Sequence, residues 1–126
     1  MNKTIIKTEN APAPIGPYNQ AVKTNDTLYV SGQIAIDPKS GALVIDNIQE
    51  ETEMVMENLK AVVEAAGLTM ENIVKTCIFI SDMDNFALIN EVYGSYFEKD
   101  FPARECVEVS VLPKRVNVEI SCIAVF

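Results

Sequence analysis

The stretch DNIQEETEMVMENLKAVVEAAGLTMENIVKTCIFI, residues 46–80, carries the two strongest secondary-structure signals of the chain. In its first part, apolar residues recur at spacings of three and four, which predicts an amphipathic helix. The recurring positions are Ile48, Thr52, Val55, Leu59, Val62 and Ala66, widened by Met56 and Val63. Residues 73–80 are rich in β-branched side chains, which predicts a buried strand.

The ends of this helix are marked by residues with known capping preferences. Asp46, with Gln49 three positions later, predicts a capping box at the start, and Gly67 predicts a left-handed residue after the end. Three acids lie in the first turns: Glu50, Glu51 and Glu53. Because negative charge is stabilising at a helix N-terminus, we interpret this cluster as a solvated helix start and not as a metal site.

Strand-like runs precede the helix. Residues 18–23 and 27–34 are separated by a Thr-Asn-Asp turn at 24–26, which predicts a hairpin. Before them, residues 10–17 (NAPAPIGP) hold three prolines and a glycine, which predict an ordered loop. A short apolar run at 4–7 is a third candidate strand.

After residue 80 we expect a second helix and two more strands. The helix is predicted over 84–99, with the apolar stripe Phe86, Ile89, Tyr93 and Tyr96 joined by Phe97, and the strands over 104–111 and 116–126. The order β-β-β-α-β-α-β-β predicts one α+β domain over residues 1–126 with both helices on one face of a sheet. Two helices cannot also cover the other face.

The last two strands carry the side chains most suited to chemistry. Because alternate residues of a strand share a face, Arg104 and Cys106 point to the same side. We expect the other side to enter the core, since it carries Val107, Val109 and Val111. The planar guanidinium of Arg104 matches a carboxylate, so we interpret it as an anion clamp.

The uncovered face of the predicted sheet is too apolar for open water and too polar for a packed core. We expect it to carry Tyr29, Ser31, Arg104, Cys106, Glu119, Ser121, Ile123 and Val125. Such a surface predicts an oligomer that buries this face and forms polar pockets between subunits.

Composition narrows the chemistry further. The 126 residues include no histidine, which excludes Ser-His-Asp and Cys-His catalysis, and the three scattered cysteines make no zinc site. The net charge of −8 and the dispersed basic residues disfavour nucleic acid as a partner. With no P-loop or GxGxxG motif, we expect neither a cofactor nor a metal. With no membrane-length apolar run and no secretory signal, we expect no membrane association and a cytoplasmic location.

Several segments, in order along nearly the whole chain, resemble the YjgF/RidA family of reactive-intermediate deaminases. They are IGPYNQA (15–21), YVSGQI (29–34), EAAGLTMENIVKTCIFISDM (64–83), FALINEVYGSYF (86–97), FPARECVEV (101–109) and LPKRVNVEI (112–120). The resemblance implies a chorismate-mutase-like α+β fold, with a mixed sheet and two helices on one face, assembled as a homotrimer with sites between subunits. It also implies hydrolysis of 2-iminobutanoate and 2-iminopropanoate, in equilibrium with enamines such as 2-aminoacrylate, to 2-keto acids and ammonia.

The same resemblance implies roles for single residues. Arg104 would hold the substrate carboxylate, and Glu119 would accept a proton from a water ordered near Cys106. Tyr18 would form a wall of the pocket. Three further positions would line or support the cleft: Ser31, Gly32 and Asn90.

Each of these roles has a structural alternative. Arg104 could be a salt-bridge partner, and Glu119 could pair with a nearby lysine or arginine. Tyr18 could be an aromatic plug and Asn90 a helix-surface amide. Glu105 departs from the family pattern, in which this position is small or weakly polar, although by alternation it points away from Arg104.

The whole chain also has alternative functions. A non-catalytic module that binds a keto or amino acid and regulates a partner would use the same arginine. RNA cleavage has been attached to relatives, but the negative charge and the absence of histidine make it the weakest of the three hypotheses.

Overall fold

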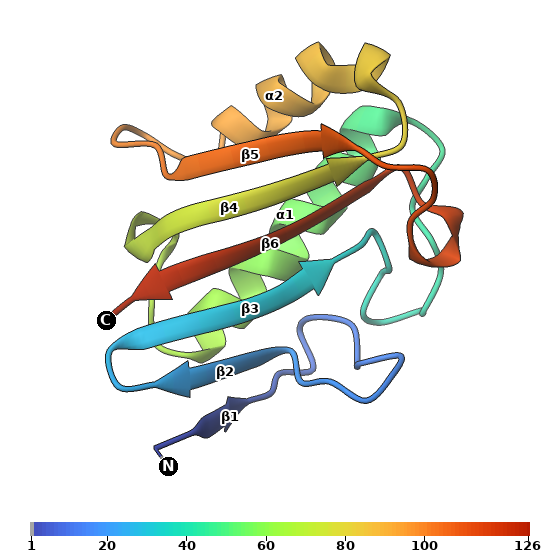
Figure 1. Cartoon of the computed structure of the whole chain (residues 1–126). Helices are drawn as coiled ribbons and strands as arrows, with labels where there is room; N and C mark the ends of the chain where they lie inside the picture. The colour runs from blue at the N-terminus through green and yellow to red at the C-terminus, as the bar shows by residue number, and fades with distance from the viewer. Residues whose placement is uncertain (1) are drawn as a thin grey trace.

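The computed structural model describes residues 2–126, which form a six-stranded sheet and two α-helices (Figure 1). The strands are β1 (Thr4–Ile6), β2 (Ala21–Thr24), β3 (Thr27–Gln33), β4 (Ile73–Ile80), β5 (Ala103–Glu108) and β6 (Val118–Val125). The helices are α1 (Ile48–Ala65) and α2 (Phe86–Gly94), with short 3-10 turns η1 (Met70–Asn72), η2 (Met83–Asn85) and η3 (Pro113–Arg115). The order of strands and helices along the chain is the predicted one.

The sheet is mixed, with strand order β1-β2-β3-β6-β4-β5. Neighbouring strands are antiparallel except β4 and β5, which run parallel and are connected through α2. The hairpin between β2 and β3 turns at Asn25 and Asp26, and Asn25 takes the left-handed conformation with φ of 54°. The last strand, β6, therefore lies in the middle of the sheet and carries its residues past both β3 and β4.

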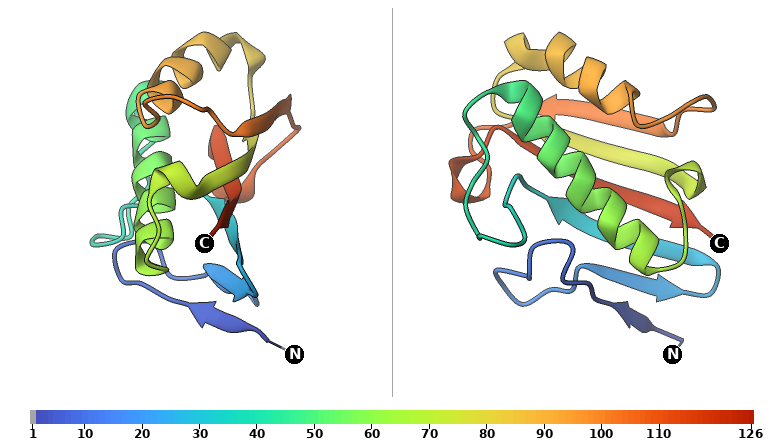
Figure 2. Two further views of the ribbon diagram at one scale, coloured as in Figure 1. Left: turned by 90° about the vertical axis from the view of Figure 1, so that its left-hand side faces the viewer. Right: turned by 180° about the vertical axis from the view of Figure 1, so that it is seen from behind.

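Both helices pack on the same face of the sheet, as predicted, and the other face is bare (Figure 2). The main core lies between the helices and this face. Its largest fully buried apolar side chains are Leu28, Met56, Leu59, Ile78, Ile80, Ile89 and Ile120. Each such side chain contributes roughly 1.5–3 kcal/mol when it leaves water, so this layer accounts for much of the stability of the fold.

The start of α1 lies one residue later than predicted. Asn47 is the N-cap, and its side-chain oxygen accepts a hydrogen bond from the Glu50 N–H at 2.8 Å. The capping box predicted for Asp46 and Gln49 is therefore wrong. At the other end, Gly67 has φ of 86°, which confirms the predicted left-handed residue.

The acidic cluster at the start of α1 is only partly solvated. Glu50 and Glu53 are exposed, but Glu51 is fully buried. Its carboxylate accepts hydrogen bonds from the backbone N–H of Asn117 at 2.6 Å, from the Asn117 side chain at 2.8 Å and from the Val118 N–H at 3.2 Å. The prediction of a solvated cluster is wrong for Glu51, which ties α1 to the start of β6.

Several elements are shorter than predicted. α2 ends at Gly94, after which Tyr96 and Phe97 continue in tighter turns that bond to residues three positions back. β2 begins at Ala21 because residues 18–20 belong to the proline-rich loop, and β5 ends at Glu108.

The side-chain orientation of β5 is opposite to the prediction. The parallel register sets Arg104 beside Thr76 and Cys106 beside Ile78, and the two β4 residues are buried under the helices. Arg104 and Cys106 share a face, as alternation predicted, but that face is the helix-covered one. The assignment to the bare face was wrong.

The valines of this segment do not enter the main core. Val107 is 44% exposed and Val111 is 55% exposed. Val109 is half-buried and packs against a small separate cluster that includes Leu112 and Val116. Apolar character did not decide which side of β5 is covered. β5 is an edge strand, and α2 and the margin of the main core cover the side that carries Arg104 and Cys106.

Candidate functional site

Arg104 is seated on one face of α2. Its Nη1 donates a hydrogen bond to Oδ1 of Asn90 at 2.7 Å, and its guanidinium carbon lies 5.6 Å from the ring centre of Phe86 and 5.2 Å from that of Tyr93. These three residues are spaced by four and three, which places them on one helix face. No carboxylate lies within salt-bridge distance of Arg104 among residues 2–126, so its other N–H donors are available to an anion.

Tyr93 is the most deeply buried of the three α2 residues that contact Arg104. It is 4% exposed, and its hydroxyl shares a hydrogen bond of 2.8 Å with Oγ1 of the buried Thr76. Burial raises the pKa of Tyr93, so the ring stays neutral and supports the cation above it. Sequence reasoning assigned Tyr93 only to an apolar stripe, although its shared helix face with Asn90 is a signal that could have found it.

Cys106 lies next to Arg104 on the same face and packs against the edge of the main core. Burial raises the pKa of its thiol, and the charge of Arg104 opposes this only in part. The thiol form therefore dominates at neutral pH, which suits a wall of a pocket better than a nucleophile.

Glu105 is directed to the other face. It forms a salt bridge with Lys75 at 3.0 Å, and the hydrogen bond to Lys75 lowers the pKa of Glu105. The Cys77 thiol also donates to its carboxylate at 3.6 Å. Glu105 thus does not occupy the donors of Arg104.

Glu119 lies on the bare face, over a β-bulge of β3. The β3–β6 register shifts between Val30 and Gln33, and a Cβ built on Gly32 would stand 2.8 Å from the Glu119 carboxyl carbon. Only glycine leaves space for the carboxyl group here. Burial raises the pKa of Glu119, which moves it toward values useful for proton transfer. No salt bridge joins it to a lysine or arginine within the described residues.

Tyr18 and Ser31 lie next to Gly32, the residue that Glu119 contacts. Tyr18 is 45% exposed and lines a narrow hollow together with Gly32. The Ser31 hydroxyl donates to the carbonyl oxygen of Asn19 at 2.6 Å, so it is engaged by the proline-rich loop.

The predicted site residues therefore form two groups instead of one. The arginine group is Arg104, Cys106 and Asn90, at the helix-covered edge of the sheet. The glutamate group is Tyr18, Ser31, Gly32 and Glu119, at the bare face. The prediction that Arg104 and Glu119 share a face is wrong for one chain.

The distance between the two groups is too large for a small ligand. Arg104 pairs with Thr76, and Thr76 lies opposite Cys122, three residues from Glu119 on β6. With strands about 4.8 Å apart and a rise of about 3.3 Å per residue, the two Cα atoms are separated by about 14 Å. Because their side chains also leave from opposite faces, a short imino acid cannot contact both within one chain.

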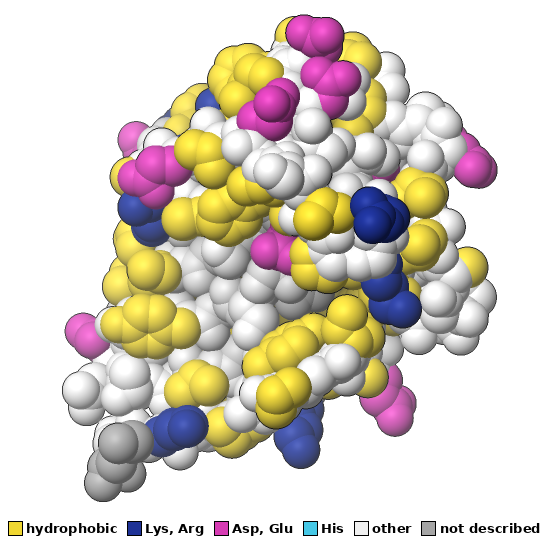
Figure 3. Space-filling model, turned by 45° about the vertical axis from the view of Figure 1, so that its right-hand side comes forward, with side chains coloured by type: hydrophobic (Ala, Val, Ile, Leu, Met, Phe, Trp, Pro, Cys, Tyr) yellow, Lys and Arg dark blue, Asp and Glu magenta, His cyan; other side chains and the backbone are white. Residues whose placement is uncertain are grey.

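The bare face has the character of an interface. Its exposed apolar side chains include Tyr29, Val107 and Val125, which are 50%, 44% and 37% exposed. Figure 3 shows hydrophobic side chains gathered in several groups over this side of the molecule. Apolar surface of this extent marks interaction sites in soluble proteins.

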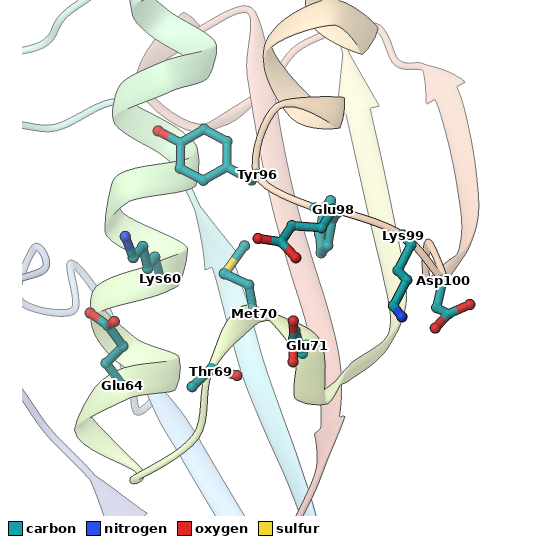
Figure 4. Close-up of a pocket in the computed structure, with 10 residues that line it drawn as sticks. Lys60, Glu64, Thr69, Met70, Glu71, Tyr96, Glu98, Lys99 and Asp100 are labelled. Carbon is teal, nitrogen blue, oxygen red and sulfur yellow. The ribbon is translucent and has the colours of Figure 1, made fainter.

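A separate hollow of about 590 Å³ lies between α1, η1 and the segment after α2 (Figure 4). Its charged lining residues are Glu64, Glu71, Glu98, Asp100, Lys60 and Lys99. In Figure 4 these side chains come from three segments, and Lys99 and Asp100 point away from the others. None of the predicted site residues lines it, and its charges do not converge on one point.

Two further features are absent from residues 2–126. No three His, Cys, Asp or Glu side chains gather so that they could hold a metal ion. No helix in this part of the chain is both long and apolar enough to cross a membrane.

Comparison with known proteins adds names to this geometry. The sequence model of a family described as endoribonuclease L-PSP matches residues 8–126. A RutC family protein of Pyrococcus horikoshii is 51% identical over 122 residues, which cover 97% of each chain. A Salmonella typhimurium protein named 2-iminobutanoate/2-iminopropanoate deaminase is 50% identical over 99% of this chain and 98% of its own. The crystal structure of E. coli TdcF with bound serine matches with a TM-score of 0.94 and 43% identity, over 98% of this chain and 99% of that one.

Proposed function

Because this chain belongs to the YjgF/RidA family, we propose that it is a 2-imino acid deaminase, a hydrolase that converts 2-iminobutanoate and 2-iminopropanoate to 2-keto acids and ammonia. The observation that carries the proposal is the packing of Arg104 against Phe86, Asn90 and Tyr93 of α2. A guanidinium held by Asn90 and two aromatic rings, with no carboxylate partner in residues 2–126, is suited to bind the carboxylate of a small acid.

We infer that the complete site forms between subunits of a homotrimer. The arginine group of one subunit would meet the glutamate group of the next, because the two groups lie on opposite faces of each sheet. The apolar bare face supports this assembly, since it would be buried by the same contacts. Around a three-fold axis, each subunit would contribute one arginine group and one glutamate group to two different sites.

The chemistry requires positioning of the substrate and a group that moves protons from oxygen to nitrogen. Arg104 would hold the substrate carboxylate and so orient the adjacent imine carbon. A water would add to that carbon while Glu119 accepts its proton and the C=N electron pair moves to nitrogen. Glu119 would return that proton to the nitrogen, which gives a carbinolamine. It would then take the hydroxyl proton and pass it to the amine as the C–N bond breaks and the C=O bond forms, which releases ammonia and the 2-keto acid. Cys106 would line the pocket as a neutral thiol.

The substrates of this reaction are short-lived products of other enzymes. Pyridoxal-phosphate dehydratases acting on serine or threonine release enamines such as 2-aminoacrylate, which equilibrate with the imines. These species can damage other pyridoxal-phosphate enzymes, so the proposed activity is protective.

The word endoribonuclease in the family description points to a different substrate, which the residues of this chain do not favour. The chain has no histidine for acid–base cleavage of RNA, and its net charge is −8. RNA binding depends on clustered cations, and the ten basic residues here are dispersed. We therefore place the deaminase first.

The proposal is tested by measuring keto-acid formation from 2-imino acids that an amino-acid oxidase or threonine dehydratase generates in place. Wild type should accelerate the reaction, and Arg104→Ala should not. Arg104→Lys should also lose most of the acceleration, because an ammonium cannot form the bidentate pair. Lys99→Ala is the matched control, since it removes an exposed cation from outside both groups and should keep full activity.

A non-catalytic binding module is the second candidate, favoured by the serine bound in the TdcF crystal structure. It predicts that wild type binds a 2-keto or amino acid in calorimetry and that Arg104→Ala does not, with no acceleration of imine hydrolysis by either. Acceleration that survives Arg104→Ala would contradict the assigned site in both readings.

A further inference from the structure

The loop that carries Tyr18 is held only weakly by its own residues: one backbone hydrogen bond lies within it, from the Tyr18 N–H to the Gly16 carbonyl at 2.9 Å, and of residues 11–19 only Ala11 is buried. Three of residues 11–17 are prolines, which have no N–H to donate. The loop borders a hollow of about 560 Å³ lined by residues that include Lys7 and Asn19, and Tyr18 also lines the narrow hollow over Gly32. With open space on two sides, its carbonyl groups need donors from elsewhere.

Gln20 supplies those donors. The residue is 3% exposed, and its Nε2 donates to the carbonyl oxygens of Thr8 at 3.0 Å, Ala11 at 3.3 Å and Pro12 at 2.9 Å. Its Oε1 accepts a hydrogen bond from the Thr8 N–H at 2.8 Å. The buried side-chain amide of Gln20 therefore ties residues 8–12, the first half of the loop, to the end of the loop.

Ser31 fixes the other half of the loop to the β-bulge. Its backbone N–H donates to the Gln20 carbonyl at 2.9 Å, and its hydroxyl donates to the Asn19 carbonyl at 2.6 Å. Ser31 precedes Gly32, on which the Glu119 carboxyl group lies. The loop is thus bonded to the strand that carries the glutamate group.

We propose that Gln20 and Ser31 are positioning residues that hold the loop of residues 8–19 and so set the place of the Tyr18 ring next to Gly32. Of the two roles expected for Ser31, lining or supporting the cleft, this proposal assigns support. The Tyr18 hydroxyl accepts a hydrogen bond from the Ile15 N–H at 3.2 Å, so its own proton is free for a ligand. The role of Tyr18 as a wall rests on the proposed function, whereas the anchoring of the loop does not.

The absence of tryptophan from the chain allows a direct test of the anchoring. Tyr18→Trp introduces a single tryptophan at the loop, and its fluorescence anisotropy, excited apart from the tyrosines, reports how firmly the loop is held. In this background, Ser31→Ala and Gln20→Ala should each lower the anisotropy, and Ser31→Thr should restore it because the hydroxyl is kept. Asn72→Ala is the control, since it removes a side-chain bond to the Val125 carbonyl far from the loop.

The functional half of the test uses the chain with Tyr18 in place. Loss of one such hydrogen bond should raise KM for a 2-imino acid on the order of two- to tenfold in Ser31→Ala, with kcat little changed, because a wall contributes to ground state and transition state alike. Ser31→Thr should recover the parent KM. Melting temperatures of all variants show whether a change reflects global unfolding.

The outcomes separate the two ideas. Unchanged anisotropy in a folded Ser31→Ala variant would overturn the anchoring. Lowered anisotropy with an unchanged KM would support the anchoring of the loop but would show that Tyr18 is not a wall of the substrate pocket. If the parent protein showed no deaminase activity, the proposed function would fail while the anisotropy arm still decided the anchoring.

Discussion

Arg104 and Glu119 are partly buried ionisable side chains, and neither forms a salt bridge within residues 2–126. Burial without an ion pair costs free energy, because a charge loses water and gains no opposite charge. For Arg104, this cost is offset by contacts with Asn90, Phe86 and Tyr93. For Glu119, burial disfavours the charged carboxylate and so raises its pKa. Residues held in this way are concentrated at functional sites.

Gly32→Ala tests the contact between the β-bulge and Glu119. The added methyl would stand 2.8 Å from the carboxyl carbon and Oε2, so the Glu119 side chain must move while the backbone stays. Since a displacement of about 1 Å can cost about a hundredfold in rate, we expect deaminase activity to fall at least tenfold with little change in melting temperature. Gly94→Ala is the control, because nothing lies within 4 Å of its added methyl. Full activity in Gly32→Ala would contradict the role of Glu119.

Glu119→Gln tests the raised pKa through stability. Burial raises the pKa of Glu119 above its ordinary value of 4.5, so between these two pKa values the folded state binds more protons than the unfolded state, and stability falls as pH rises. The glutamine variant has no charge to bury. We expect it to be more stable than wild type above the raised pKa, with the difference vanishing below pH 4.5, in urea unfolding at a fixed protein concentration. An equal difference at every pH would contradict the burial of this carboxyl group.

At the scale of secondary-structure elements, α1 and α2 each do more than cover the sheet. The buried Glu51 of α1 accepts hydrogen bonds from the backbone of Asn117 and Val118, which fixes where β6 begins, one residue before Glu119. α2 supplies the seat of Arg104. Each helix therefore supports one of the two groups through an edge or end of a strand.

Glu51→Ala should be strongly destabilising for this reason. It leaves the N–H groups of Asn117 and Val118 and the Asn117 amide without their acceptor in a largely buried place. Such unsatisfied groups cost about 1–3 kcal/mol each, and three groups lose their acceptor, so we expect a loss of at least about 3 kcal/mol in the free energy of unfolding, measured with urea. Glu50→Ala, at an exposed position of the same turn, should cost well under 1 kcal/mol. Equal costs for the two variants would show that the buried contact has no special weight.

At the scale of the whole molecule, the fold places the arginine group and the glutamate group on opposite faces of the sheet, although the proposed reaction needs both at one substrate. The helix layer is on one side of the sheet and the bare apolar face on the other (Figure 2). A single chain can present the arginine group or the glutamate group to a ligand, but not both to the same one. Assembly through the bare face would bury its exposed apolar side chains. It would also bring the arginine group of one subunit to the glutamate group of the next.

Mixing two inactive variants tests the shared site. Trimers are refolded from equal amounts of Arg104→Ala and Glu119→Gln chains. A site is then intact only when a Glu119→Gln chain supplies its arginine and a neighbouring Arg104→Ala chain supplies its glutamate. Random assembly makes about one quarter of the sites intact, so we expect about a quarter of wild-type activity. Each variant refolded alone is the control and should stay inactive. A mixture as inactive as its parts would show that one chain supplies the whole site.

The sequence by itself determined the order of the elements, the shared face of Arg104 and Cys106, and the family. These depend on local periodicity and on short motifs, which are readable residue by residue. Only the tertiary structure decided which face of β5 is covered, that Glu51 is buried, that α2 seats Arg104, and that Gln20 and Ser31 hold the Tyr18 loop. Alternation fixes which side chains share a face, but the face that enters the interior is set by where a distant helix packs, and that contact has no signature within the strand.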